Sequence, residues 1–304
     1  MDSLTLKQLR YFEALAAHGH FGRAAAASAI SQPALSVQIK ELEESLGATL
    51  FERNARRVRL TPFGEDFALR VREVLRAVDE LGDLARAARG PLAGRLRIGV
   101  IPTVAPYLLP RIIADLTLRD LDLDLQVRET LTQKLIEELL DGRLDTAIVA
   151  LPVSEPSLDE TPLFSEDFVL IRPETDAGKP TPDREELSEM RLLLLEEGHC
   201  FRDQALSFCS IRSPLSRGSL DGSSLSTLVQ MVASGIGVTL IPEMALKVET
   251  QAAPVDVARF DAPTPERTIG MVWRRTSPLA DQLREIAEVV KGSAETVGAR
   301  VRPV

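Results

Sequence analysis

The chain has 304 residues, 44% of them hydrophobic, and a formal net charge of −9. This length exceeds the roughly 100 to 200 residues of a typical single domain, so we expect two domains or one domain with a smaller module. No run of 18 uncharged apolar residues occurs, and the N-terminal MDSLTLKQLR lacks the basic and then apolar layout of a signal peptide. We therefore expect a cytoplasmic protein without a membrane partner.

The charged residues are unevenly distributed along the chain. Residues 1–90 are close to neutral, whereas residues 91–304 carry the acidic excess. Within the first segment, RNARRVR (Arg53–Arg59) contains four arginines and no acidic residue. Such a local positive field favours phosphate binding, which the overall acidity hides.

The first 60 residues predict short helices followed by a hairpin. Thr5 and Gln8 have the spacing of a capping box at the start of the first helix. A second, small-residue helix follows in FGRAAAAS. In the next segment, Ser31 is a strong N-cap, Pro33 suits the first helical turn, and Gly47 ends the helix.

This arrangement predicts a helix-turn-helix that reads base edges in a major groove of double-stranded DNA. The segment 50–62 adds two short strands around a basic tip, a wing that contacts phosphate or the minor groove. A small helical domain with solvated polar faces is the alternative. The residues that we expect at the DNA, the last three of them on phosphate, are Ser31, Gln32, Pro33, Ser36, Gln38, Lys40, Arg53, Arg56 and Arg57.

Residues 64–90 predict a long helix with an apolar heptad seam. A lone helix cannot bury such a seam, so we expect it to dimerise, which would match a two-fold operator. Packing against the chain's own second domain is the alternative. The expected interface residues are Phe67, Val71, Val74, Val78 and Leu81.

The Pro- and Gly-containing segment 89–94 is the expected linker, which divides the chain into residues 1–63, 64–90 and 91–304. Strands then alternate with helices. Strands are expected at 96–101, 123–129, 145–151, 168–172, 192–197, 237–242 and 268–274, and helices at 107–117, 132–141, 224–234 and from about 278.

This alternation predicts parallel sheets with ligand sites at the carboxyl ends of the strands. The strands fall into two groups, split near Ser165, which predicts two lobes with a cleft between them. Lobe I would comprise about 91–164 and 269–304, and lobe II about 165–268.

Both cysteines lie in GHCFRDQALSFC, nine positions apart. In a reducing compartment, a bridge between them would be catalytic or redox-sensing rather than a structural staple. Nine residues of helix span about 13 Å, and nine extended residues about 30 Å, whereas a disulfide needs Cα atoms roughly 4.4 to 6.8 Å apart. If RDQALSF is helical in the reduced protein, Cys200 and Cys209 can bond only after that helix unwinds, so oxidation would switch the conformation.

The surroundings of Cys200 suit the attacking thiol. A reactive thiolate is favoured near a helix N-terminus or a cation, and a helix starting after Cys200 together with Arg202 and His199 would supply both. Oxidation of this thiolate would give a sulfenic acid, which Cys209 would convert to a disulfide. Zinc binding lacks a fourth ligand and paired spacing, so no metal is expected.

Residues 1–90 resemble the LysR-type transcriptional regulators through LKQLRYFEALAAHGHFGRAAAASAISQPALSVQIKELEESLGATLFER and TPFGE. The resemblance runs the length of the chain. It implies an α+β multidomain protein with an N-terminal winged helix-turn-helix, a long linker helix and a C-terminal two-lobed α/β domain of periplasmic-binding-protein type. IPTVAPYLLP, GHCFRDQALSFC and RTIGMVWRRTSPL are similar to the peroxide-sensing subgroup of this family.

The resemblance also implies residue roles. It makes Cys200 the peroxidatic and Cys209 the resolving cysteine. The positions that it matches to the peroxide pocket or its support are Thr103, Thr132, Asp203 and Arg267. From the sequence alone, N-cap roles for both threonines and a surface position for Arg267 stay open.

The chain departs from the subgroup at one point. Members often carry a histidine shortly before the helix that begins here at Ser224, whereas this chain has Ser219 nearest. A role for a second imidazole beside the thiolate is therefore in doubt.

The leading interpretation is a peroxide-responsive transcription factor and not an enzyme. A regulator that senses a small metabolite in its cleft and a thiol peroxidase stay open as alternatives. The resemblance further implies a homotetramer assembled from homodimers, RNA polymerase as a partner, and glutaredoxin-type reduction. No cofactor is expected.

Overall fold

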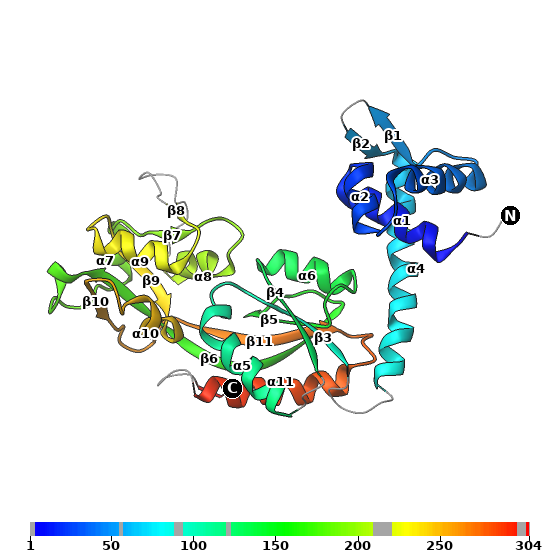
Figure 1. Cartoon of the computed structure of the whole chain (residues 1–304). Helices are drawn as coiled ribbons and strands as arrows, with labels where there is room; N and C mark the ends of the chain where they lie inside the picture. The colour runs from blue at the N-terminus through cyan, green and yellow to red at the C-terminus, as the bar shows by residue number, and fades with distance from the viewer. Residues whose placement is uncertain are drawn as a thin grey trace. The chain divides into compact units, whose positions relative to one another are not determined.

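The computed structural model describes residues 4–54, 57–87, 94–119, 123–208, 221–296 and 302–303. The chain forms two compact units, Met1–Asp83 and Leu84–Val304 (Figure 1). Among the helices of these residues, none is long and apolar enough to cross a membrane.

The first unit is a helix-turn-helix with a hairpin. Its elements are α1 (Leu6–His18), α2 (Phe21–Ala27), α3 (Gln32–Leu46), β1 (Phe51–Asn54), β2 (Arg57–Leu60) and most of α4 (Pro62–Ala87). The strands β1 and β2 pair antiparallel, so the expected wing is present.

The predicted helix signals of this unit are confirmed. Thr5 and Gln8 form the capping box of α1, and the hydroxyl of Ser31 accepts a 3.3 Å hydrogen bond from the backbone N–H of Ala34. Gly47 ends α3 at a φ of 64°, in the left-handed region that favours glycine. The start of α1 and both ends of α3 therefore lie at the capping residues that the sequence predicted.

The core of the first unit takes up part of the predicted heptad seam. The ring of Phe12 on α1 lies 5.2 Å from that of Phe51 and 5.1 Å from that of Phe67, between centroids. Val71 is buried in the same cluster. Farther along α4, Val74 and Leu81 are 45% and 64% exposed. The start of the seam thus holds α4 to the helix-turn-helix, and its later positions remain available to a partner.

The second unit contains a mixed sheet with the strand order β10-β6-β11-β5-β3-β4, and β9 and β12 also pair with β6. Its strands are β3 (Arg95–Val100), β4 (Asp124–Glu129), β5 (Thr146–Leu151), β6 (Leu158–Pro173), β9 (Thr239–Pro242), β10 (Val255–Ala258), β11 (Glu266–Arg274) and β12 (Arg302–Pro303). A separate pair is formed by β7 (Leu194–Leu195) and β8 (Asp221–Gly222).

The prediction of parallel sheets is wrong for most of this unit. Strand β3 is parallel to β4 and β5, and β7 is parallel to β8, but β6, β9, β10 and β11 pair antiparallel. The expected division at Ser165 falls inside β6, a continuous strand of 16 residues. Only its apolar end, FVLIR, was predicted, because the preceding LDETPLFSED carries acidic residues and a proline that obscure the strand pattern.

Helices cover the sheet in two groups, and we call these the first lobe and the second lobe. The first lobe holds α5 (Ala105–Arg119), α6 (Thr132–Leu140) and α11 (Ala280–Glu295). The second holds α7 (Arg184–Glu189), α8 (Cys200–Phe208), α9 (Leu225–Ala233) and α10 (Leu246–Glu249), with the 3-10 turns η1 (Glu174–Asp176) and η3 (Glu243–Ala245). Strands β6 and β11 run from one group to the other, and the two-lobed architecture is confirmed (Figure 1).

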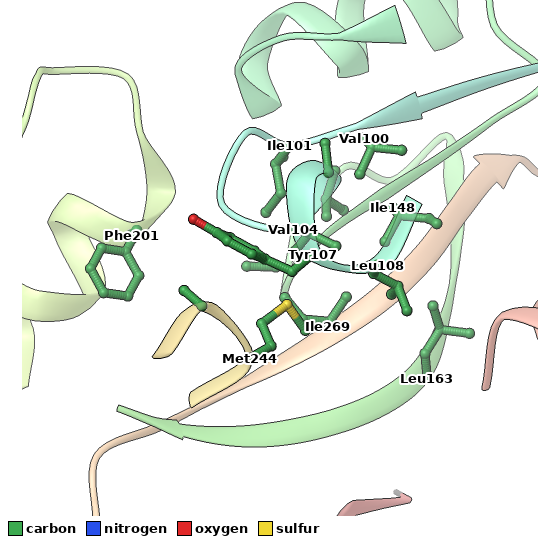
Figure 2. Close-up of a cluster of buried hydrophobic side chains, with 14 of the residues drawn as sticks. Val100, Ile101, Val104, Tyr107, Leu108, Ile148, Leu163, Phe201, Met244 and Ile269 are labelled. Carbon is green, nitrogen blue, oxygen red and sulfur yellow. The ribbon is translucent and has the colours of Figure 1, made fainter. Parts of the chain in front are cut away.

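One buried cluster joins the two lobes. It includes Val100 and Ile148 of the first lobe together with Phe201 and Met244 of the second. Figure 2 shows Tyr107 of α5 among these side chains, with its hydroxyl oxygen on the side that faces Phe201. The lobes therefore share a core near the segment that carries Cys200.

Candidate redox site

Cys200 is the first residue of α8 and a half-buried free thiol. The first turn of a helix presents backbone N–H groups without helical partners, and the helix dipole favours an anion there. The sulfur of Cys200 therefore lies at the end of α8 that presents these N–H groups. Cys209 and Ser219 lie outside the described residues.

The segment RDQALSF is helical, as the switch hypothesis requires. Eight residue steps from Cys200 to Phe208 correspond to about 12 Å along the helix axis. The helix is anchored through Phe201 and Ala205, which are buried, and through Phe208, whose ring packs edge-on against Phe260 at 5.2 Å. Position 209 cannot reach disulfide distance from Cys200 while this helix is intact.

Arg202, which we expected to supply a cation beside the thiol, instead binds the β7–β8 pair. Its Nη1 donates to the carbonyl oxygen of Leu195 at 2.7 Å and to Oδ1 of Asp221 at 2.9 Å, and the residue is buried. The guanidinium charge is thus paired, and Arg202 ties α8 to the β7–β8 pair. Asp203 lies exposed in the first turn of α8.

His199 is half-buried directly before Cys200. Burial lowers the pKa of its imidazole, and the nearby Glu196 carboxylate opposes that shift. The neutral imidazole is therefore favoured, so His199 can accept or relay a proton and is a poor permanent cation.

Arg267 is a buried residue on β11, so the surface position that the sequence left open for it is wrong. Its Nη1 donates to Thr103 Oγ1 at 2.8 Å and its Nη2 to the Thr103 carbonyl oxygen at 3.0 Å. Its Nε donates to Glu166 Oε1 at 2.8 Å. The buried guanidinium of Arg267 thereby holds both the hydroxyl and the carbonyl oxygen of Thr103.

Thr132 is the first residue of α6, not its N-cap. The N-cap is Leu131, which makes no side-chain cap bond. Thr132 Oγ1 is buried and finds no hydrogen-bond partner within the part of the chain that the structure describes. This hydroxyl can both donate and accept a hydrogen bond.

A turn brings the start of α6 close to Cys200. Gly198 has a φ of +94°, and a Cβ on it would lie 3.0 Å from Cδ1 of Leu131. A glycine is therefore favoured at this position, both for its backbone conformation and for the close approach. Leu131, which precedes Thr132, therefore lies close to Gly198, which is two residues before Cys200.

A cavity of about 130 Å³ lies between the lobes beside this turn. It brings together Thr103 and His199, whereas Cys200 and Thr132 are not among its lining residues. Its wall consists of Pro102, Thr103, Pro106, Tyr107, Glu129, Leu195, His199, Ser223, Ser224, Leu225, Ser226 and Glu249. Hydroxyls, two carboxylates and one imidazole share this wall with prolines and leucines, so the pocket is partly polar and partly apolar.

Sequence analysis missed two carboxylates at this junction, Glu166 and Glu249. Glu249 accepts hydrogen bonds from Tyr107 and Ser226, and Glu166 binds Arg267. Each pairs with a residue far away along the chain, so no local pattern marks it. Glu166 is buried and Glu249 half-buried, and both positions appear only once the chain is folded.

The expected DNA-contacting residues lie along the N-terminal half of α3. Ser31, Gln32, Pro33 and Lys40 are exposed, and Ser36 and Gln38 are half-buried. Lys40 pairs with Glu44 at 3.3 Å and Gln38 donates to Glu41 at 2.7 Å. Arg53 and Arg57 belong to β1 and β2, and their side chains, like all of Arg56, lie outside the described part.

Family models match both units. Residues 6–65 match the bacterial regulatory helix-turn-helix protein of the lysR family, and residues 89–295 match the LysR substrate binding domain. The chain belongs to the LysR family of transcriptional regulators.

Among relatives, a probable hydrogen peroxide-inducible genes activator of Streptomyces viridosporus is 45% identical and aligns over 98% of this chain and 96% of its own length. A full-length cysteine-to-aspartate variant of OxyR from Pseudomonas aeruginosa has a TM-score of 0.77 at 37% identity, covering 99% of this chain and 98% of that one. A cysteine-to-serine variant of Corynebacterium glutamicum OxyR bound to hydrogen peroxide has a TM-score of 0.67 at 35% identity, with coverages of 96% and 93%.

Proposed function

We propose that this protein is a peroxide-sensing transcription regulator in which hydrogen peroxide oxidises Cys200 and a disulfide with Cys209 changes the DNA contacts. The observation that carries this proposal is the free thiol of Cys200 at the start of α8, directly after His199, which lines the cavity between the lobes. The similarity to peroxide-inducible activators and to a peroxide-bound OxyR variant supports it.

In the first step, the Cys200 thiolate attacks one oxygen of the peroxide and the O–O bond breaks. The leaving hydroxide takes up a proton and departs as water, while Cys200 becomes a sulfenic acid. Thr103 donates its hydroxyl hydrogen to the peroxide, Thr132 offers a second hydroxyl, and neutral His199 passes on the proton. These groups stabilise the charge that develops on the leaving oxygen.

In the second step, the Cys209 thiol attacks the sulfenic sulfur and a second water leaves. The helix α8 holds the two positions apart, so this step requires it to unwind. Phe201 and Ala205 then lose their buried contacts, which transmits the change into the shared core of the lobes. A glutaredoxin-type dithiol reverses the reaction by thiol–disulfide exchange.

In this proposal, residues 1–63 bind DNA, residues 64–90 form the linker and dimerisation helix, and residues 91–304 form the regulatory domain. Two chains associate through the exposed seam positions of α4, such as Val74 and Leu81, and present two copies of α3 to a two-fold operator. Pairs of dimers form a tetramer, and the oxidised form recruits RNA polymerase.

The decisive experiment is mass spectrometry of the peptide that spans Cys200 and Cys209, after one equivalent of hydrogen peroxide is added to reduced protein. Loss of two hydrogens within seconds supports the proposal, and Cys200→Ser abolishes the peroxide-induced change in the DNA footprint. No reaction, together with a thermal shift on adding a metabolite, favours an effector-binding regulator. Sustained turnover with a reductant favours a thiol peroxidase.

A further inference from the structure

We propose that Glu166 is a positioning residue for the oxidation of Cys200: through Arg267, it fixes the hydroxyl of Thr103 as a donor to peroxide. This inference rests on the proposed function. Glu166 lies on β6 in the middle of the unit and lines no part of the cavity. It acts through Arg267 and touches neither peroxide nor sulfur.

The first argument is the enclosure of the ion pair. The side chains of Glu166 and Arg267 are both 0% exposed, and Arg267 Nη2 lies 2.7 Å from Glu166 Oε1. The second carboxylate oxygen of Glu166 accepts a 3.1 Å hydrogen bond from the backbone N–H of Met244. A guanidinium that is fully removed from water needs a fixed counter-charge, and Glu166 supplies it. The position of Arg267 therefore depends on Glu166.

The second argument is the direction of the hydrogen bonds. A guanidinium has no acceptor, so Arg267 must donate to Thr103 Oγ1 across the 2.8 Å contact. That bond occupies a lone pair of Oγ1 and leaves the hydroxyl hydrogen to be given elsewhere. Within the described residues, Thr103 Oγ1 has no further partner, and Thr103 lines the cavity. Arg267 thus presets this hydroxyl as a donor to a ligand in the cavity.

The third argument links the same guanidinium to the cysteine helix. The central carbon of the Arg267 guanidinium lies 5.6 Å from the ring centroid of Phe201, the residue after Cys200. Phe201 also packs edge-on against Phe168 at 4.9 Å. One buried cation therefore contacts both Thr103 and the first turn of α8, which sets the geometry between donor and thiol.

The test uses the full-length protein with Glu166→Gln, which keeps the shape of the side chain but removes its charge. Asp145→Asn is the matched control, because Asp145 is also a buried carboxylate that accepts from an arginine, Arg97 at 2.6 Å, and from a backbone N–H at 2.8 Å. Asp145 contributes nothing to the cavity wall. For each protein, the rate constant of Cys200 oxidation by hydrogen peroxide is measured beside its rate of alkylation by iodoacetamide.

We expect E166Q to slow oxidation by about tenfold or more, and to change alkylation less than about twofold, because only peroxide needs the oriented hydroxyl. D145N is expected to react like the wild type in both assays. Combining E166Q with Thr103→Val should slow oxidation no further than T103V alone, because both changes remove the same donor. The inference is overturned if the double variant slows oxidation by the product of the two single effects. It is also overturned if E166Q slows oxidation and alkylation equally.

Failure of the inference is distinguishable from failure of the proposed function. If wild-type Cys200 does not react with one equivalent of peroxide within seconds, the proposed function fails. If the wild type reacts fast and E166Q equally fast, only the role of Glu166 is wrong. Should E166Q not fold, Glu166→Asp replaces it, because it keeps the charge but withdraws it from Arg267. Selective loss of the peroxide rate then supports the role, and unchanged rates overturn it.

Discussion

The phenol oxygen of Tyr107 donates a 2.5 Å hydrogen bond to Oε1 of Glu249, across the cavity wall between the two lobes. The other carboxylate oxygen of Glu249 accepts from Ser226 at 2.6 Å. Burial, followed by the bond to Glu249, raises the pKa of Tyr107 well above its usual range. The phenol therefore keeps its proton, and this carboxylate connects α5 of the first lobe with α9 of the second.

Replacing Tyr107 by Phe should destabilise the second unit. A hydrogen bond to a charged acceptor contributes about 1.5 to 3 kcal/mol, so we expect a loss of that order in the free energy of unfolding. The single tryptophan, Trp273, is buried in this unit, so its fluorescence during urea unfolding measures the change. Tyr11→Phe in the first unit is the control and should leave this transition where it is. The same free energy of unfolding for both variants would contradict the prediction.

The imidazole of His199 should titrate below the usual histidine range, because burial lowers its pKa. The unfolded chain takes up this proton near its ordinary pKa of about 6.5, while the folded protein resists it. The contribution of His199 to stability is thus complete above about pH 6.5 and is lost as the pH falls toward the lowered value. NMR titration of the three histidines checks this, with His199→Gln assigning the signal. A midpoint at or above the usual value would refute it.

Gly198→Ala should both destabilise the second unit and slow the reaction of Cys200. Its φ of +94° is strained for any residue with a Cβ, and that atom would press on Leu131. Gly235→Ala is a matched control, since Gly235 has a φ of +74° but its Cβ would meet nothing within 4 Å. Each variant is expected to lose about 1 to 2 kcal/mol from backbone strain. Only G198A should also slow the oxidation of Cys200, which stopped-flow measurements against peroxide can compare.

Removing one arginine from the wing should make DNA binding less dependent on salt. For Arg57→Gln, we expect the slope of log K against log salt to fall by about 1 in magnitude, because one phosphate contact is lost. Lys134→Gln, on the exposed face of α6 in the second unit, is the control. Binding isotherms at several salt concentrations provide the test, and identical slopes for R57Q and the wild type would argue against a wing on phosphate.

Features encoded locally were predicted well from the sequence. The caps at Thr5, Ser31 and Gly47 depend on a few neighbouring residues, and the helix over RDQALSF depends on its own composition. The redox hypothesis was likewise based on a local feature, the spacing of the two cysteines in one short segment. These predictions needed no knowledge of distant contacts.

Features that depend on distant partners were not predictable in this way. Glu166 meets Arg267 over a separation of 101 residues, and Tyr107 meets Glu249 over 142. Each looks like an ordinary helical or strand residue in its own segment. The polar half of β6 was missed for a related reason, since its pairing with β11 and not its own pattern makes it a strand.

The antiparallel pairing of β6 with β11 runs from Glu266↔Asp167 to Arg274↔Leu158, through the centre of the second unit. The register shifts once, between Ile269 and Gly270, and bending the lobes about this ribbon would strain many backbone hydrogen bonds together. Unwinding one helix of nine residues disturbs far fewer. The architecture thus combines a hydrogen-bonded frame that both lobes share with one short helix, whose side chains reach into the core between them.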